Sequence, residues 1–173
     1  MHQEYAVLCE EIPHPKCALN FSNPFELLVA TVLSAQTIDK RVNMVTPELF
    51  DEYPGPDALA SAIPEHVESI IHSIGFHRTK AKNIIGLSYA LCERFDGEVP
   101  QNMDSLTSLP GVGRKTANVV LGNAFGVPGF PVDTHVIRVT GRLRWRSDWA
   151  SGSPDPKAIE REITACFPPE EWT

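Results

Sequence analysis

Residues 109–116, Leu-Pro-Gly-Val-Gly-Arg-Lys-Thr, constrain the fold of this 173-residue chain more than any other segment. A proline and two glycines within residues 110–113 cannot lie inside a helix. Residues 103–108 before them suit a short helix. After them, apolar residues recur at helical spacing up to a glycine stop, namely Ala117, Val120, Leu121, Ala124 and then Gly126. The segment therefore predicts a helix, a tight hairpin and a second helix over about residues 103–125.

The rest of the chain also reads as helices joined by short links. Asn23-Pro24-Phe25-Glu26 is a helix start with a capping residue, a first-turn proline and a glutamate three residues after the cap. Further helices are expected from about residue 37 to 46, ending before Pro47, from 64 to 75, from 81 to 95 and from 155 to 167. No segment alternates strictly enough to predict a β-strand. The expected fold class is all-α.

The hairpin has the features of an anion-binding site. Its glycines allow the backbone to approach another molecule, and the amides that open the second helix form a natural anion site. Lys115 lies in the first turn of that helix, and Asp133 follows 18 residues later in Pro-Val-Asp-Thr-His. Taken alone, the glycine pattern is equally typical of an ordinary helical turn with a surface lysine.

The charge distribution is uneven. The net charge is −7, with 11 acidic and 3 basic residues in 1–70 but 5 acidic and 10 basic residues in 71–146. Phosphates respond to such a local basic excess within a Debye length of roughly 8–10 Å. The acidic ends predict modest, salt-sensitive binding to nucleic acid.

No apolar run is long enough to cross a membrane, and the N-terminus lacks the basic and apolar segments of a secretory signal. We therefore expect a cytoplasmic protein. Its four cysteines, Cys9, Cys17, Cys92 and Cys166, show no Cys-x-x-Cys spacing, so neither a metal site nor a disulfide framework is predicted.

At this point the chain resembles a known family, the endonuclease III branch of the helix–hairpin–helix DNA glycosylases. The resemblance runs from Pro13-His14-Pro15 to Pro168. It rests mainly on Leu33-Ser34-Ala35-Gln36-Thr37-Ile38-Asp39, residues 109–118 and Val132-Asp133-Thr134-His135. It implies two helical domains flanking a cleft: residues 17–127 with the hairpin at the rim, and residues 1–16 plus 128–173. The C-terminal part of the second domain would be incomplete.

The resemblance also implies a function. It suggests a bifunctional DNA glycosylase and abasic-site lyase of base excision repair, which acts as a monomer on double-stranded DNA carrying oxidised pyrimidines or abasic sites in the bacterial cytoplasm, associated with the nucleoid. Lys115 would be the nucleophile and Asp133 the catalytic carboxylate. The helix dipole and Arg114 disfavour the ammonium form of Lys115, whereas Asp133 favours it.

Family members place further residues against DNA. By resemblance, Gln36 enters the space left by the flipped nucleotide, and Phe76 with His77 wedges at the opposite strand. His135 lies near the pocket. Arg78 and Lys80 belong to the basic segment, and the phosphate is held by the hairpin residues Gly111, Val112, Gly113 and Arg114.

Relatives usually carry a 4Fe-4S cluster on four cysteines near the C-terminus. None of the four cysteines present occupies such a position, so no cofactor or metal is assigned to this chain. The ligands would lie beyond Thr173. We therefore expect either that the sequence is a piece of a longer protein or that the cluster is absent.

Two alternatives remain. The chain could be a non-catalytic helix–hairpin–helix DNA-binding fragment, inactive because a C-terminal segment is missing. It could also be a purely structural helical module whose hairpin contacts another protein. Strand cleavage separates the first alternative from an enzyme, and salt-dependent DNA affinity separates the second.

Overall fold

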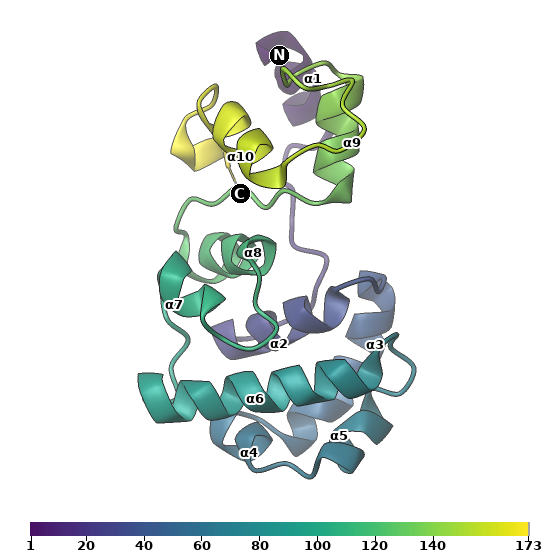
Figure 1. Cartoon of the computed structure of the whole chain (residues 1–173), viewed down its shortest axis with the longest axis vertical. Helices are drawn as coiled ribbons and strands as arrows, with labels where there is room; N and C mark the ends of the chain where they lie inside the picture. The colour runs from purple at the N-terminus through teal and green to yellow at the C-terminus, as the bar shows by residue number, and fades with distance from the viewer. Residues whose placement is uncertain (173) are drawn as a thin grey trace.

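The computed structural model describes residues 1–172, and within this range it contains helices and no β-strand. This confirms the predicted all-α fold class. Figure 1 shows two lobes, the larger built from α2 to α8 and the smaller from α1, α9 and α10. The elements are α1 (His2–Glu11), α2 (Pro24–Ser34), α3 (Asp39–Glu52), α4 (Pro56–Ala60), α5 (Pro64–Ile70), α6 (His77–Phe95), α7 (Met103–Thr107), α8 (Arg114–Phe125), α9 (Thr134–Arg142), α10 (Pro156–Thr164) and the short 3₁₀ helix η1 (Pro169–Glu171).

Helix α2 forms the centre of the larger lobe. It begins at the predicted capping box, where Asn23 Oδ1 accepts from Glu26 N at 2.9 Å and the Glu26 carboxylate accepts from Ser22 N at 2.6 Å. Every residue from Leu27 to Leu33 is buried. Because the helix has no exposed face over this range, it packs against α3, α6 and α8 at once.

Several predicted helix boundaries are wrong. Helix α6 begins at His77 rather than at about residue 81, and α10 ends at Thr164 rather than at about residue 167. Helix α3 continues through Pro47 to Glu52 instead of stopping before the proline. Pro47 lies on the exposed side, where solvent can replace the hydrogen bond that proline cannot donate, and Val45 and Leu49 hold both halves of the helix to the core. Helix α5 ends at Ile70 rather than at Gly75, and a tight turn with Ile74 N bonded to Ile71 O follows.

The helix–hairpin–helix is present as predicted, with α7 and α8 joined by residues 108–113. Leu109 and Val112 anchor the hairpin in the core. Gly111 has φ +75° and lies so close to α6 that an added Cβ would be 2.8 Å from Asn83 Nδ2. Only glycine fits this position, because both the backbone angle and the contact exclude a side chain.

The smaller lobe joins the two ends of the described chain. Its buried cluster is Trp145, Ile159, Ile163 and Phe167, and Tyr5 of α1 packs against it with ring centroids 4.6 Å from Phe167. A separate and larger cluster fills the other lobe. No helix within residues 1–172 has both the length and the apolar character needed to cross a membrane.

The division into domains 17–127 and 1–16 plus 128–173 stays a prediction, and the two separate buried clusters are its support. Thr173, the last residue of that second domain, lies outside the described residues.

Candidate active site

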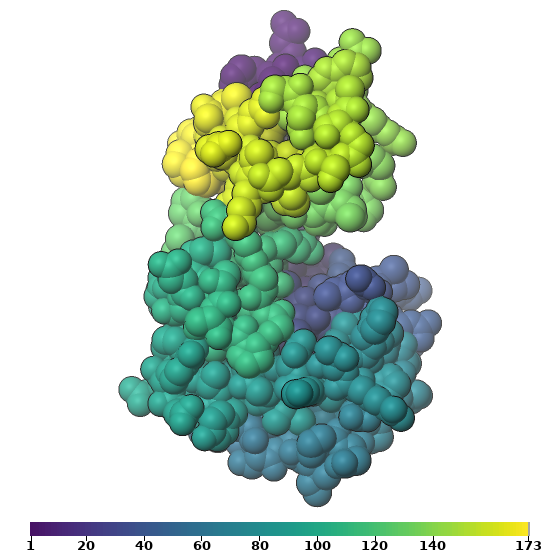
Figure 2. Space-filling model, in the orientation of Figure 1, coloured from purple at the N-terminus to yellow at the C-terminus, as the bar shows by residue number. Residues whose placement is uncertain are grey.

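Lys115 and Asp133 face each other between the two lobes. Lys115 extends from the first turn of α8, and Asp133 is the residue on which α9 begins. Their closest polar atoms, Lys115 Nζ and Asp133 Oδ2, are 4.0 Å apart, and the side chains are 45% and 33% exposed. The space-filling view is hollowed between the lobes on its right-hand side (Figure 2). The pair can therefore attract each other and still be reached from solvent.

The Asp133 carboxylate has two separate tasks. Its Oδ1 accepts hydrogen bonds from the backbone amides of His135 and Val136, at 2.8 and 2.9 Å. This is the N-cap of α9, and it fixes the orientation of the carboxylate. Oδ2 is the atom that remains directed toward Lys115. Capping of α9 by Oδ1 is therefore compatible with a reactive role for Oδ2.

The hairpin offers backbone donors beside Lys115. Helix α8 has no side-chain cap, and its first backbone hydrogen bond runs from Ala117 N to Gly113 O at 2.9 Å. The amides of Gly111 and Gly113 make no hydrogen bond to the described residues. The Val112 amide is already bonded to Leu109 O at 3.2 Å. An anion at this helix start would therefore accept hydrogen bonds from the amides of the two glycines and of the first turn of α8, whereas Val112 contributes packing.

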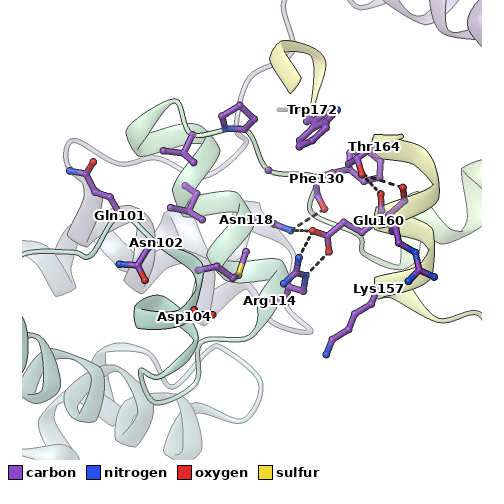
Figure 3. A pocket seen from close by; sticks show the side chains of 16 residues that line it. Gln101, Asn102, Asp104, Arg114, Asn118, Phe130, Lys157, Glu160, Thr164 and Trp172 are labelled. Atoms are coloured by element: carbon purple, nitrogen blue, oxygen red, sulfur yellow. Dashed lines mark hydrogen bonds and ion pairs between the residues drawn. The ribbon is translucent and has the colours of Figure 1, made fainter. Parts of the chain in front are cut away.

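Arg114 is held by a partner that sequence reasoning missed. Its Nε and Nη2 donate to the two carboxylate oxygens of Glu160 on α10, at 2.7 and 2.9 Å, and the Asn118 side chain donates to the same carboxylate at 3.2 Å (Figure 3). The carboxylate raises the pKa of the Arg114 guanidinium above its ordinary value. Arg114 thus ties α8 to α10 across the lobes. A phosphate contact from Arg114 stays a prediction, and the guanidinium would have to share or leave Glu160 to make it.

Lys80 is not on the surface. It is only 5% exposed, and its Nζ donates to Leu33 O at the end of α2 and to Thr37 Oγ1, both at 2.8 Å. Burial lowers the pKa of this ammonium. The predicted DNA contact of Lys80 stays untested, and the geometry gives it a different task, that of fixing the turn at Gln36.

Gln36 and Phe76 line one cavity of about 220 Å³, together with Lys80, Asn83 and Gly111. Both residues have left-handed backbones, with φ of 54° and 59°, and both side chains are exposed. Strained backbones persist only where their surroundings hold them. The structure therefore brings together two predicted DNA contacts that are 40 residues apart in sequence.

The remaining candidates lie at the edges of this region. His77 is the half-buried first residue of α6. Arg78 is exposed, with its Nε 3.7 Å from Glu68 Oε2. His135 is exposed on α9, and its Nδ1 is 2.9 Å from Arg138 Nη2.

A cavity of about 920 Å³ lies between α7, α8 and α10, and the Arg114–Glu160 pair forms part of its wall (Figure 3). It is lined by Asn118, Phe130 and Trp172, among others, but not by Lys115 or Asp133. Its size alone therefore does not identify the reactive centre.

No group of three or more His, Cys, Asp or Glu side chains within residues 1–172 is arranged to hold a metal ion, and the four cysteines are free. The predicted ligands beyond Thr173 lie outside the sequence.

Comparison with known proteins places this arrangement among repair enzymes. The family model described as HhH-GPD superfamily base excision DNA repair protein matches residues 29–169. The chain is 49% identical to the endonuclease III of Synechocystis sp. over 96% of its length and 74% of that relative. It is 47% identical to the endonuclease III of Bacillus subtilis over 93% of its length and 72% of that relative. Its fold is similar to that of a trapped endonuclease III–DNA covalent intermediate, with a TM-score of 0.91, 44% identity and coverage of 96% and 76% of the two chains.

Proposed function

The chain belongs to the HhH-GPD superfamily of base excision DNA repair proteins, and from that premise we propose that it is a DNA glycosylase and abasic-site lyase. In this proposal Lys115 removes an oxidised pyrimidine through a Schiff base and cleaves the strand 3′ to the abasic site by β-elimination. The observation that carries the proposal is the 4.0 Å approach of Lys115 Nζ to Asp133 Oδ2 at the uncapped start of α8. One solved relative is an endonuclease III trapped in a covalent intermediate with DNA, and a covalent step in so similar a fold supports the proposal.

The reaction begins with the damaged nucleotide turned out of the duplex into the hollow between the lobes. Lys115 must attack as the free amine, and Asp133 Oδ2 is placed to take its proton as the two groups close. The nitrogen bonds to C1′, and the base departs with the electrons of the C1′–N bond and receives that proton. The ionised Asp133 then stabilises the positive charge on the nitrogen that is now bonded to C1′.

The second stage breaks the strand. Ring opening gives an imine between Lys115 and C1′, which makes the C2′ hydrogen acidic. Asp133 is the nearby carboxylate that can accept this proton, after which the C2′–C3′ double bond forms and the 3′ phosphate leaves with the electrons of the C3′–O bond. Water hydrolyses the imine and frees Lys115, and Asp133 releases the C2′ proton to the departing phosphate or to solvent, so the groups of the protein end in their starting states.

DNA is the partner that this proposal requires, bound by the protein as a monomer in the cytoplasm. Gln36 fills the vacated space, Phe76 and His77 contact the opposite strand, and the amides of Gly111 and Gly113 hold a phosphate without reading sequence. The common cavity below Gln36 and Phe76 supports their joint action. The predicted division at residue 127 would put Lys115 on one domain and Asp133 on the other.

Borohydride trapping tests the proposal. The protein is incubated with abasic-site duplex and reduced, and the covalent adduct is counted on a denaturing gel. We expect an adduct with the wild-type chain and with Lys157→Ala, an exposed lysine of α10, and none with Lys115→Ala. An undiminished adduct in Lys115→Ala would show that another amine is the nucleophile.

The main rival, a non-catalytic DNA-binding fragment, shares the hairpin and makes a different prediction. It binds abasic duplex with a strong salt dependence but leaves the strand intact. Nicking of several duplexes per protein molecule excludes it. Salt-dependent binding with neither adduct nor nicks excludes the enzyme.

A further inference from the structure

Lys80 is a buried charged group that the proposed reaction does not use. It lies in the first turn of α6, it is only 5% exposed, and it forms no ion pair with the described residues. An ammonium that leaves water without an opposite charge is costly, and burial lowers the pKa of this one. Its hydrogen bonds offset that cost, so the groups that they hold indicate what Lys80 does.

Gln36 occupies a turn position that favours glycine. Thr37 N donates to Ser34 O at 2.9 Å and closes residues 34–37 into a turn. The two central residues have the angles of a type II turn, with φ −54° and ψ 117° at Ala35 and φ 54° at Gln36. A positive φ strains any residue that has a Cβ, so the surroundings must hold Gln36 in this conformation.

The ammonium of Lys80 bonds to both sides of this turn. Its Nζ donates to Leu33 O, near the end of α2, and to Thr37 Oγ1, both at 2.8 Å. The carbonyls at a helix end lack helical partners, and a cation there also interacts favourably with the helix dipole. Because Gln36 lies between the two acceptors, the hydrogen bonds oppose the rotation that would return its backbone to a relaxed conformation.

The main chain of Lys80 holds a second strained residue. Its backbone N donates to Phe76 O at 3.0 Å, and Phe76 has a left-handed backbone, with φ 59°, where α6 begins. Gln36 and Phe76 are both exposed and line one cavity. The side chain of Lys80 therefore ties the turn of Gln36 to the helix start that carries Phe76.

We propose that Lys80 is a positioning residue, whose side chain holds Gln36 in place beside Phe76 so that it fills the gap left by a nucleotide turned out of the duplex. The inference rests on the proposed function. A side chain that is already in its bound arrangement loses little conformational freedom on binding DNA, whereas a released turn spends part of its time in relaxed conformations that cannot fill the gap. In this role Lys80 needs no contact with DNA.

The variants remove the hydrogen bonds of Lys80 in different ways. Lys80→Met keeps the length of the side chain and loses both bonds. Thr37→Val keeps the shape of the side chain and loses one bond, and Thr37→Ser keeps the hydroxyl. Lys82→Met, which changes an exposed lysine of the same helix, is the matched control. Gln36→Ala, with and without Lys80→Met, shows whether Lys80 acts through Gln36.

Two measurements are made at saturating protein. The first is the rise in fluorescence of a 2-aminopurine base placed opposite a non-cleavable abasic analogue, because inserted side chains unstack this base and relieve its quenching. The second is the single-turnover rate of borohydride adduct formation on abasic DNA, as a duplex and as a single strand. The single strand has no gap in a base stack to fill, so its rate reports the reactive centre and the fold alone.

We expect Lys80→Met to lower the duplex rate about tenfold and the fluorescence rise by about half, while the single-strand rate stays within about twofold of wild type. A tenfold loss corresponds to about 1.4 kcal/mol, the scale of one strained residue. Thr37→Val should lose about threefold on the duplex, and Thr37→Ser and Lys82→Met should match the wild type. In the Gln36→Ala background, Lys80→Met should lower the duplex rate by less than about twofold more.

Several results would overturn the inference. If Lys80→Met slows both substrates equally, or if its loss adds in full to that of Gln36→Ala, Lys80 only stabilises the fold. A wild-type duplex rate in Lys80→Met has the same meaning for its role. If Lys80→Met does not fold, the pair Thr37→Val and Thr37→Ser decides by the same criteria.

The fluorescence separates this inference from the proposed function. If the wild type raises the fluorescence but forms no adduct, the proposed chemistry is wrong, and the fluorescence of the variants still decides the role of Lys80. If the wild type does not raise the fluorescence, Gln36 does not enter the duplex, and the inference is wrong whether or not an adduct forms.

Discussion

Glu160 should hold the two lobes together, and its replacement by alanine tests this directly. The carboxylate is 14% exposed and accepts from Arg114 at 2.7 and 2.9 Å and from the buried Asn118 at 3.2 Å. Because Arg114 is about half exposed, solvent screens its attraction, which we set at about 1 kcal/mol. The hydrogen bond from Asn118 contributes about 1 kcal/mol more. Glu160→Ala should therefore lower the free energy of unfolding by about 2 kcal/mol.

The assay is urea unfolding followed by circular dichroism, with thermal melting as a second measure. For a chain of this size the loss corresponds to a fall in the melting temperature of about 4–8 °C. Glu160→Gln keeps one acceptor oxygen and the shape of the side chain, so it should lose about half as much. Glu98→Ala, an exposed carboxylate with no hydrogen bond to the described residues, is the control and should change stability by less than about 0.5 kcal/mol.

The same variant should slow borohydride trapping, because Arg114 precedes Lys115 and a loosened α8–α10 contact lets Lys115 move away from Asp133. The reasoning fails if Glu160→Ala is as stable as the control variant. It also fails if stability falls but trapping keeps its wild-type rate, since the clamp would then have no influence on the reactive pair.

Three further predictions concern other parts of the molecule. Gly111→Ala should lower the free energy of unfolding by about 2 kcal/mol or more, because φ is positive and the added Cβ would contact Asn83. Gly126→Ala should lower it by only about 1 kcal/mol, because φ is 65° but nothing lies within 4 Å of the added Cβ. Equal losses in urea titration would contradict the close contact at Gly111. Lys80→Met should destabilise by about 1–2 kcal/mol at neutral pH. Because the pKa of Lys80 is lowered in the folded state, the unfolded chain binds more protons than the folded chain as the pH approaches 10.5. The contribution of Lys80 to stability therefore grows with pH, and the stability difference between wild type and Lys80→Met should be larger at pH 10 than at neutral pH. Burial and Asp57 raise the pKa of the Cys92 thiol from 9 to about 11, so the contribution of the neutral thiol to stability is complete below pH 9 and is lost as the pH rises above it. Between pH 8 and 10 the wild type should therefore lose about 1 kcal/mol more stability than Cys92→Ala.

Local signals predicted most of the helices, because each start depends on residues a few positions apart. Asn23, Asp133 and Asp155 cap the helices that they precede, and Gly126 ends α8 with a left-handed backbone. The same local reasoning failed at Pro47. There the buried residues on both sides kept α3 continuous, and burial is a property of the packed molecule.

The binding partners of charged side chains were harder to predict from the sequence. Lys80 and Arg114 are basic residues in a basic segment, and both were predicted to contact DNA. The structure buries Lys80 against residues 43 and 47 positions away and pairs Arg114 with a carboxylate 46 positions away. No sequence pattern within a helix predicts such distant partners. Glu160 was missed for the same reason.

The sequence by itself determined the helical elements, the glycine hairpin, the family and the two residues, Lys115 and Asp133, on which the proposed chemistry depends. These follow from short-range rules of backbone conformation and from motifs of a few residues. Only the tertiary structure decided which basic side chains remain free to meet a phosphate and which join one part of the protein to another. The physical reason is that a charge is satisfied by whatever packing brings within about 3 Å of it, and that neighbour is set by the fold rather than by distance along the chain.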